Sequence, residues 1–272
     1  MIIPLKNLSL LLLWMSLSIA VSAIASHAPN EPANSTLANE PERCQLKYAW
    51  APVPPFIVSN SPDPSGYQID MIRWIAAELN CELKFIELDW ANSLKGIEAG
   101  TVDIIGRSSL TAERQQWAQF SNPYSSEILV LNIRKGEKEK YRGLGLEALL
   151  QQGFKLGVLK EAYYGPSIER LQRTFIANLY EYPFAIDLLI ALERNEIDGF
   201  FEAPFILDSE IMSAVGQRNL EEYPIEIVTG DLHFMFSKKS VAPEFIESFN
   251  QALQIVKASE AYQKHEYWSR KR

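Results

Sequence analysis

The fold is decided by residues 83–105, whose sequence is LKFIELDWANSLKGIEAGTVDII. The apolar run at 83–88 has strand character, and residues 92–99 repeat apolar side chains at helical spacing. A second short apolar run, 102–105, follows Gly100. A strand, a helix and a strand in this order form a βα unit. Successive units of this kind predict a parallel sheet covered by helices.

The same alternation continues on both sides of this stretch. Before it, the pattern predicts a strand at 46–50 and a helix at 71–79 with Asp70 as its N-cap. After a charged, turn-like stretch at 134–142, a second series predicts strands at 155–159, 179–182 and 197–201 and helices at 166–176 and 184–195. Apolar segments at 128–133 and 232–237 flank that series. Helices opened by Pro243 and near 259–268 close the chain.

This order of elements predicts an α/β protein of two lobes, because the chain builds one βα series, then a second, and then returns to the first. Two connecting segments form a hinge, and a ligand is expected in the cleft between the lobes. The expected divisions are a signal peptide at 1–25, a disordered linker at 26–43, lobe one at 44–130, lobe two at 131–231 and a return to lobe one at 232–272.

The first residues have the pattern of a secretory signal. Lys6 is the only charge before an apolar stretch at 8–20, and the small-residue motif Ala23-Ile24-Ala25 follows it. Cleavage is predicted before Ser26, with Val21-Ser22-Ala23 as a second possible site. A membrane anchor is the alternative, but about 20 apolar residues are needed to span a bilayer and this core is shorter. We therefore expect export to the periplasm.

Composition excludes several functions. The 272 residues are 47% hydrophobic and 22% charged, with a formal net charge of −8, which is ordinary for a globular protein. The longest basic run is Arg270-Lys271-Arg272, so the electrostatic footprint of a nucleic-acid binder is absent from the sequence. The three histidines, His27, His233 and His265, are scattered. We expect no metal and no cofactor.

Cys44 and Cys81 are the only cysteines, and each comes just before a predicted strand. If those strands are parallel neighbours joined by one crossover, the two sulfur atoms start side by side. An oxidising compartment then favours a disulfide, worth about 3 to 4 kcal/mol in the chain-entropy model. The alternative is a pair of buried free thiols.

Several short motifs, in this order, resemble the type 3 extracellular solute-binding proteins, which include periplasmic receptors of polar amino-acid importers. The resemblance covers residues 46–268. Its carriers are Pro54-Pro55-Phe56, Gly66-Tyr67-Gln68-Ile69-Asp70, Asp89-Trp90, Gly100-Thr101-Val102-Asp103-Ile104-Ile105, Thr111-Ala112-Glu113-Arg114 and Phe120-Ser121-Asn122-Pro123-Tyr124. It implies a two-lobed periplasmic-binding-protein fold of type II, a small-molecule solute and an ABC permease of the inner membrane as partner. We expect a monomer.

Arg114 is the first candidate binding residue. Thr111 is predicted to cap a helix that places Arg114 in its first turn, where a cation opposes the helix dipole and an anion would resolve the conflict. In the family the matching Arg holds the α-carboxylate of the ligand, and Ser109 falls where a Ser contacts the same group. The alternatives are a surface Arg paired with Glu113 and a simple turn hydroxyl at Ser109.

Three further side chains of lobe one are candidates. Trp90 matches an aromatic plate that stacks on the ligand in the family, or else it packs between helices. Trp50 lies at the carboxyl end of the first strand, where open parallel sheets bind ligands. Arg107 stands where the family has a small residue. It would favour a second anionic group on the ligand, or it pairs with an acid across the cleft.

Lobe two matches the family less well. A Gly-Thr pair that touches the carboxylate in the family is replaced by KEAYYG at 160–165. Where the family has an Asp for the α-ammonium group, this chain has Ala203, with Glu202 one position early. Glu202 reaches the cleft only if a bulge or turn intervenes. Tyr163 and Tyr164 supply hydroxyls or stacking, or they close the lobe surface. Whether the solute is an α-amino acid stays open.

These observations favour a receptor for a small carboxylate-bearing solute, serving an ABC-type importer. The first alternative is a lyase of the cyclohexadienyl dehydratase kind, in which Glu202, Glu161 or a Tyr would act as acid or base. The sequence contains no committed catalytic dyad or triad, so we expect a binding protein. The second alternative is a stand-alone sensor module that acts through a separate partner.

Overall fold

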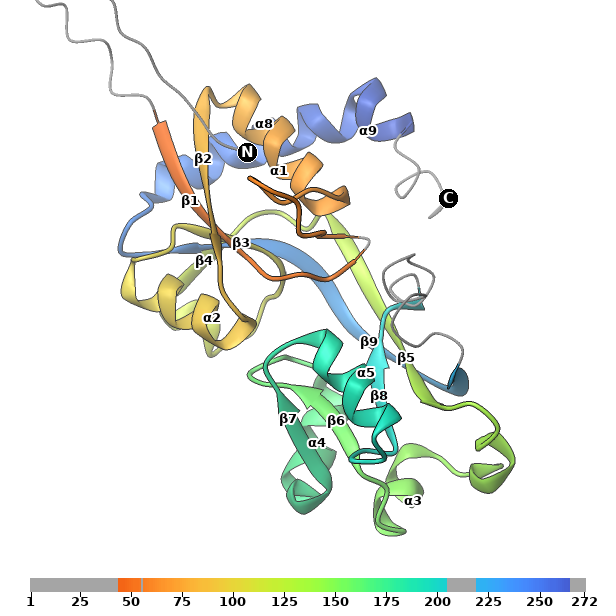
Figure 1. Ribbon diagram of the computed structural model, residues 1–272. Coiled ribbons are helices and arrows are strands. Elements are labelled where there is room, and N and C mark those ends of the chain that lie inside the picture. The colour runs from red at the N-terminus through yellow and green to blue at the C-terminus, as the bar shows by residue number, and fades with distance from the viewer. Residues whose placement is uncertain (1–43, 55, 205–218, 265–272) are drawn as a thin grey trace, which may run out of the picture. The chain divides into compact units, whose positions relative to one another are not determined.

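The structure is a computed structural model that describes residues 44–54, 56–204 and 219–264 (Figure 1). The predicted signal peptide and linker, His27, His265, Pro55 and the end of the last predicted helix lie outside the described residues. Within the described ranges, no helix combines the length and the apolar character needed to cross a bilayer.

The described strands belong to one mixed sheet. They are β1 (Cys44–Trp50), β2 (Cys81–Glu87), β3 (Ile104–Ser109), β4 (Ala118–Phe120), β5 (Ser125–Arg134), β6 (Leu156–Leu159), β7 (Leu179–Tyr182), β8 (Gly199–Glu202) and β9 (Leu220–Ser237). The helices are α1 (Tyr67–Glu78), α2 (Trp90–Ala99), α3 (Leu146–Gln151), α4 (Pro166–Thr174), α5 (Ala185–Glu193), α8 (Pro243–Ala258) and α9 (Glu260–Lys264). Single 3₁₀ turns are η1 (Arg114–Gln116), η2 (Lys138–Tyr141) and η3 (Ile176–Asn178).

The sheet runs in the order β2-β1-β3-β9-β5-β8-β6-β7, with β4 beside β9. β1 pairs in parallel with β2 and β3, and β6 pairs in parallel with β7 and β8. β9 and β5 are antiparallel to each other and to the strands next to them. The parallel arrangement predicted from the βα units is therefore correct within each group and wrong for the sheet as a whole.

Each parallel group belongs to one lobe. The first lobe consists of β1–β4 with α1, α2 and α8, and the second consists of β6–β8 with α3, α4 and α5. β5 and β9 run through both, as Figure 1 shows. The predicted two-lobed α/β fold with two connecting segments is confirmed.

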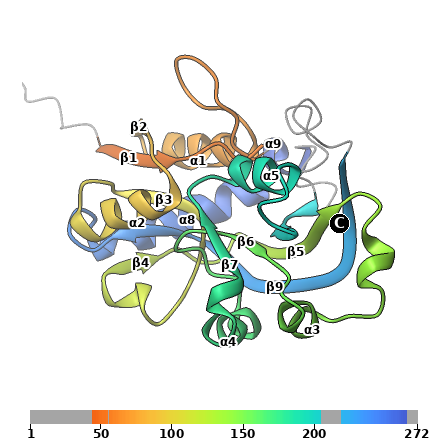
Figure 2. The ribbon, with the colours of Figure 1, turned by 60° about the horizontal axis from the view of Figure 1, so that its bottom comes forward.

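The connecting strand β9 is much longer than the segment predicted at 232–237. It begins at Leu220, and Figure 2 shows it as one continuous, curved strand. Residues 220–231, LEEYPIEIVTGD, contain Pro224 and Gly230, and most of their side chains alternate between exposed and buried or partly buried positions. Pro and Gly normally mark the end of a strand, so this half of β9 was missed. The register shifts that accompany its curvature lie opposite Glu127 and Val130.

The predicted cap of α1 is also wrong. The helix begins at Tyr67, after Gly66 with φ 106°, and Asp70 lies in its first turn. A positive φ of this size is available to Gly at little cost, so the backbone of Gly66 sets the helix start. Of the expected apolar face Met71, Trp74, Ile75 and Leu79, the first and third are fully buried and the other two are partly buried.

Successive side chains of β9 pack against helices on both faces of the sheet in the first lobe. Phe234 and Phe236 point to one face, and each makes an edge contact with Phe249 of α8 at 5.1 and 4.8 Å between ring centroids. Met235 points to the other face and packs in a cluster with Leu94 of α2. The alternation follows from the two-residue period of a strand.

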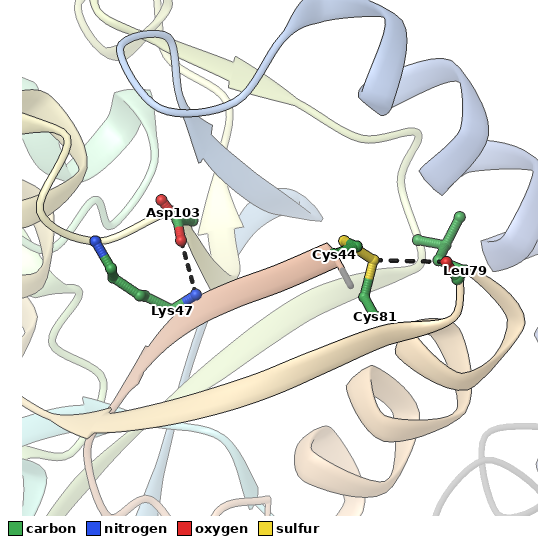
Figure 3. Close-up of a disulfide and its surroundings, with 5 residues drawn as sticks. All are labelled: Cys44, Lys47, Leu79, Cys81 and Asp103. Carbon is green, nitrogen blue, oxygen red and sulfur yellow. Dashed lines mark hydrogen bonds between the residues drawn. A yellow bond between two sulfur atoms is a disulfide. The ribbon is translucent and has the colours of Figure 1, made fainter. Parts of the chain in front are cut away.

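The predicted disulfide is confirmed. Cys44 and Cys81 open two parallel strands in direct register, with their Cα atoms 4.4 Å apart, and their sulfur atoms are bonded (Figure 3). A second contact orients β1 further along, where the Lys47 amide donates to Asp103 Oδ2 at 2.8 Å. Both cysteines are used in this bond.

Candidate functional site

A cavity of about 150 Å³ opens where the parallel strands of both lobes end. Trp50 closes β1, Ser109 closes β3, and Trp90 follows β2 by three residues. From the second lobe, Leu159 closes β6 and Glu202 closes β8. The carboxyl ends of parallel strands are the edge where open α/β sheets bind ligands. A cavity of this volume holds a molecule about the size of benzene.

The cavity wall is mostly apolar and carries four charged side chains. Arg107, Arg114 and Glu127 come from the first lobe and β5, and Glu202 comes from the second lobe. The apolar and aromatic lining includes Trp50, Val53, Ile57, Leu88, Trp90, Leu129, Leu159, Tyr163, Tyr164, Phe184 and Phe201. A few polar groups on an apolar wall are typical of small-molecule sites. Within the described ranges, no group of three His, Cys, Asp or Glu side chains is placed to hold a metal ion.

Arg114 is buried at the cavity wall with 6% of its surface exposed. Its Nη1 donates to the backbone oxygen of Ser109 at 3.1 Å, and its Nη2 donates to the backbone oxygen of Glu161 at 2.9 Å. Burial lowers the pKa of the guanidinium, and nearby Glu113 and Glu161 act in the opposite direction. Among the described residues no carboxylate makes an ion pair with Arg114.

The local geometry of Arg114 differs from the prediction in one respect. Thr111 Oγ1 accepts the backbone N–H of Arg114 at 3.2 Å, as a cap would. The segment that follows is a single 3₁₀ turn of three residues and not a helix. A turn this short has no significant macrodipole, so the predicted conflict between dipole and cation does not arise. Burial and backbone acceptors hold the guanidinium instead.

Trp90 is the first residue of α2, and Asp89 caps that helix by accepting the N–H of Asn92 at 2.8 Å. Its indole Nε1 donates to the backbone oxygen of Glu161 at 3.0 Å. The guanidinium carbon of Arg114 lies 5.3 Å from the centre of the Trp90 ring. Trp90 therefore lines the cavity both as an aromatic surface and as a hydrogen-bond donor.

Arg107 pairs with an acid, but that acid lies on β5, within the predicted lobe one, and not across the cleft as the prediction had it. Its Nη2 lies 2.5 Å from Glu127 Oε1 on β5, and its guanidinium carbon lies 4.1 Å above the ring of Phe56. Thr229 Oγ1 donates to the other oxygen of Glu127 at 3.0 Å. Arg107 has φ 53°, a left-handed backbone conformation that is uncommon outside glycine. The Arg107–Glu127 pair ties β3 to both connecting strands.

Glu202 faces the cavity with 6% of its surface exposed. Its pKa is raised to about 7, mainly by burial and to a smaller extent by Glu127, while the Ala203 amide and Arg107 act in the opposite direction. The Ala203 amide donates to Glu202 Oε1 at 2.8 Å. Val130, the β5 residue paired with Glu202, lies next to a register shift against β9. β8 itself pairs with β5 in continuous register from Gly199 to Glu202, so the bulge that the sequence required is not present in β8.

The remaining candidates also lie at the cavity. Ser109 and Trp50 are buried there, and Tyr163 lines the second-lobe side. Burial raises the pKa of the Tyr163 hydroxyl, as does Glu169. The hydroxyl of Tyr164 instead accepts the N–H of Leu159 at 2.9 Å, so it braces the loop after β6.

Sequence reasoning missed two groups at this site. Glu127 precedes an apolar run and lies outside the motifs of the family. Its pairing with Arg107 depends on the antiparallel packing of β5, which the sequence did not predict. The backbone oxygen of Glu161 was missed because side-chain patterns do not report carbonyl positions. Its φ of 61° marks a sharp turn within the stretch 160–165, where the Gly-Thr pair of the family is replaced. The unusual sequence of that stretch was the available signal.

The chain belongs to the bacterial extracellular solute-binding proteins, family 3, whose sequence pattern matches residues 46–270. A probable histidine-binding protein of Campylobacter jejuni is 25% identical over 242 residues, which is 87% of this chain and 86% of that protein. The membrane-bound lytic murein transglycosylase F of Desulfosudis oleivorans is 27% identical over 133 residues, but these are only 26% of that protein. Relatives that match over most of the chain are binding proteins, as predicted.

Solved structures agree with the fold. An ancestral arginine-binding protein bound to arginine has a TM-score of 0.70 at 19% identity, covering 83% of this chain and 98% of that one. An arginine-specific periplasmic binding protein of Salmonella typhimurium has a TM-score of 0.66 at 19% identity, covering 83% and 99%. These likenesses establish the two-lobed fold.

Proposed function

We propose that this protein is a periplasmic receptor that closes around a small carboxylate-bearing solute and delivers it to an ABC permease of the inner membrane. The solute is an amino acid or a related acid. The proposal includes the lobe boundaries predicted at 44–130, 131–231 and 232–272, export through the predicted signal peptide, and action as a monomer.

The observation that carries the proposal is the buried guanidinium of Arg114. It faces a cavity between the lobes and is held by backbone oxygens, so it keeps its full charge available for an anionic ligand. A guanidinium matches a carboxylate with two parallel hydrogen bonds. Exclusion of water as the lobes close would strengthen that contact.

The second end of the site is proposed to recognise the rest of the solute. Glu202, which lines the cavity, would accept hydrogen bonds from an ammonium group, although it stands one position before the residue that serves this role in the family. Trp50, Trp90 and Tyr163 would contact the apolar part. The Arg107–Glu127 pair leaves Arg107 engaged with an acid of the chain, which weakens its proposed role for a second anionic group.

The probable histidine-binding relative and the arginine-binding neighbours suggest where a ligand search should begin. Thermal-shift screening of the exported chain should use histidine, arginine and glutamine, then further amino acids, dicarboxylates and amines. A solute at 100 times its dissociation constant adds about 2.7 kcal/mol of stability. If no acid raised the melting temperature and an amine without a carboxylate did, the proposed ligand chemistry would be wrong.

The decisive variant is Arg114→Gln, tested by calorimetry with whichever acid the screen identifies. Loss of a charge-assisted hydrogen bond should weaken binding by about 10- to 150-fold. Arg142→Gln is the matched control, because the Arg142 side chain follows η2, is 79% exposed and is not part of the cavity lining. Equal affinity in the two variants, with both folded by circular dichroism, would remove Arg114 from the site.

A further inference from the structure

The carbonyl group of Glu161 occupies an unusual position in the site. It accepts two hydrogen bonds at once, from Arg114 Nη2 at 2.9 Å and from Trp90 Nε1 at 3.0 Å. Both donors belong to the first lobe, whereas Glu161 follows β6 in the second lobe. The three groups therefore connect the lobes directly across the cavity mouth.

The backbone of Glu161 is shaped to deliver this carbonyl. Its φ of 61° lies in the left-handed region, which non-glycine residues adopt at a cost of roughly 1 kcal/mol or more. The side chain of Glu161 is exposed, so it gives no packing reason for this conformation. The tight turn is closed by the Ala162 amide, which donates to the Leu159 carbonyl at 3.1 Å. The two hydrogen bonds across the cleft offset the strain.

We propose that the Glu161 carbonyl is an internal latch that closes the two lobes in the absence of solute. This inference rests on the proposed function, because the latch uses the same donors that would grip the solute's carboxylate. Trp90 then acts as a hydrogen-bond donor at this point and not only as an aromatic plate. An incoming carboxylate displaces the carbonyl and must break its two hydrogen bonds. The free energy of these bonds is therefore subtracted from the binding free energy of the solute.

Two variants at Glu161 separate the carbonyl from the side chain. Glu161→Pro forbids the positive φ, because proline fixes φ near −65°, and so withdraws the carbonyl while leaving both donors intact. Glu161→Gly removes the same side chain and keeps the left-handed conformation accessible. The Glu161 amide makes no backbone hydrogen bond in the described structure, so its loss in the Pro variant breaks none.

The readout is the distance between spin labels on cysteines introduced at Lys95 in α2 and Glu169 in α4, both exposed, measured without any solute. The unsubstituted chain and Glu161→Gly should be mostly closed. Glu161→Pro should shift the open-to-closed ratio by about 30-fold or more, since two hydrogen bonds are lost, one of them charge-assisted. Trp90→Phe removes one neutral donor and should shift the ratio by about two- to tenfold in the same direction.

A fourth substitution, Trp74→Phe in α1, controls for loss of an indole outside the cavity lining and should leave the ratio unchanged. An unsubstituted chain that is mostly open, or equal opening in the Gly and Pro variants, would overturn the latch. If Glu161→Pro fails to fold, an unchanged ratio in Trp90→Phe would overturn it by itself. Because no solute is present, this result is independent of the calorimetry with Arg114→Gln.

Discussion

Glu202 and Arg114 are both buried at the cavity, and burial disfavours the charged form of each. It raises the pKa of Glu202 to about 7 and lowers the pKa of Arg114. A guanidinium nevertheless stays protonated in proteins, so Arg114 remains a cation throughout the physiological range. The charge of the site near neutral pH is therefore set by the proton on Glu202.

Glu202 should make the stability of the folded chain depend on pH. The folded chain holds the proton until about pH 7, whereas the unfolded chain releases it near pH 4.5. Unfolding then releases a proton between these values, and stability falls as pH rises through this window. A shift of this size corresponds to about 3 kcal/mol at most.

The neutral isostere Glu202→Gln removes the titrating carboxyl group and should remove its contribution to the pH dependence of folding stability. Relative to the unsubstituted chain, its free energy of unfolding in urea should be similar at pH 4 and higher at pH 8, by up to about 3 kcal/mol. Glu244→Gln, an exposed position on α8, is the control and should show no such trend. A constant difference across the pH range would show that Glu202 is not desolvated.

The predictable residues of the site were those that a local motif carries. Arg114, Ser109 and Trp90 lie in short motifs after strands, and the ends of parallel strands meet at one edge. Glu127 and the carbonyl of Glu161 depend on an antiparallel pairing and on one backbone angle. Neither property follows from side-chain pattern, so the sequence predicted side chains that line the cavity better than the groups that hold them in place.

At the scale of elements, the Arg107–Glu127 pair fastens β3 to β5, where the chain leaves the first lobe. Their side chains are 16% and 15% exposed, so little water is available to either charge alone. Arg107→Gln should destabilise the protein by about 3 kcal/mol, because it leaves the charge of Glu127 buried without its cationic partner. The double variant Arg107→Gln, Glu127→Gln should recover most of this loss in urea unfolding. Additive losses would show that the pair is not coupled.

The disulfide joins the first residues of β1 and β2, with β2 at the edge of the sheet. The two cysteines are 37 residues apart, so the bond restricts a substantial loop of the unfolded chain. Replacing both by serine should lower the free energy of unfolding by about 3 to 4 kcal/mol. The unsubstituted chain under reducing conditions should unfold at the same denaturant concentration as the double variant. A loss below about 1 kcal/mol would contradict this account.

Elements were predictable where local periodicity and tertiary contacts agree. α8 was expected from Pro243 and its apolar stripe, and Phe249, Leu253 and Val256 are buried as predicted. The first half of β9 was not expected, because Pro224 and Gly230 interrupt it and these residue types normally mark the end of a strand.

At the scale of the whole molecule, the site exists because the strands of the two lobes end toward one shared cavity. Three parallel strands of each lobe contribute to this edge, and β5 and β9 hold the two groups together. Neither lobe contains both Arg114 and Glu202. Binding a solute at both ends therefore requires the lobes to approach each other, which couples recognition to closure.

Two predictions concern the compartment in which the protein folds. One is the signal peptide expected at 1–25, and the other is that the disulfide forms only in an oxidising compartment. Expressed from Met1 in a Gram-negative host, the chain should be recovered from the periplasm beginning at Ser26, or at Ile24 if the second cleavage site is used. Its two cysteines should be unreactive toward a thiol reagent, because the periplasm is oxidising. A chain expressed in the cytosol without residues 2–25 should instead react at both.

Mass spectrometry of the intact chains reads cleavage and thiol labelling together. Ala25→Leu places a large side chain at the predicted cleavage position and should shift processing to the site after Ala23 or prevent it. Exported chains that retain Met1 would contradict the signal peptide. Reactive thiols in a correctly cleaved periplasmic chain would contradict the disulfide alone, so the two predictions fail separately.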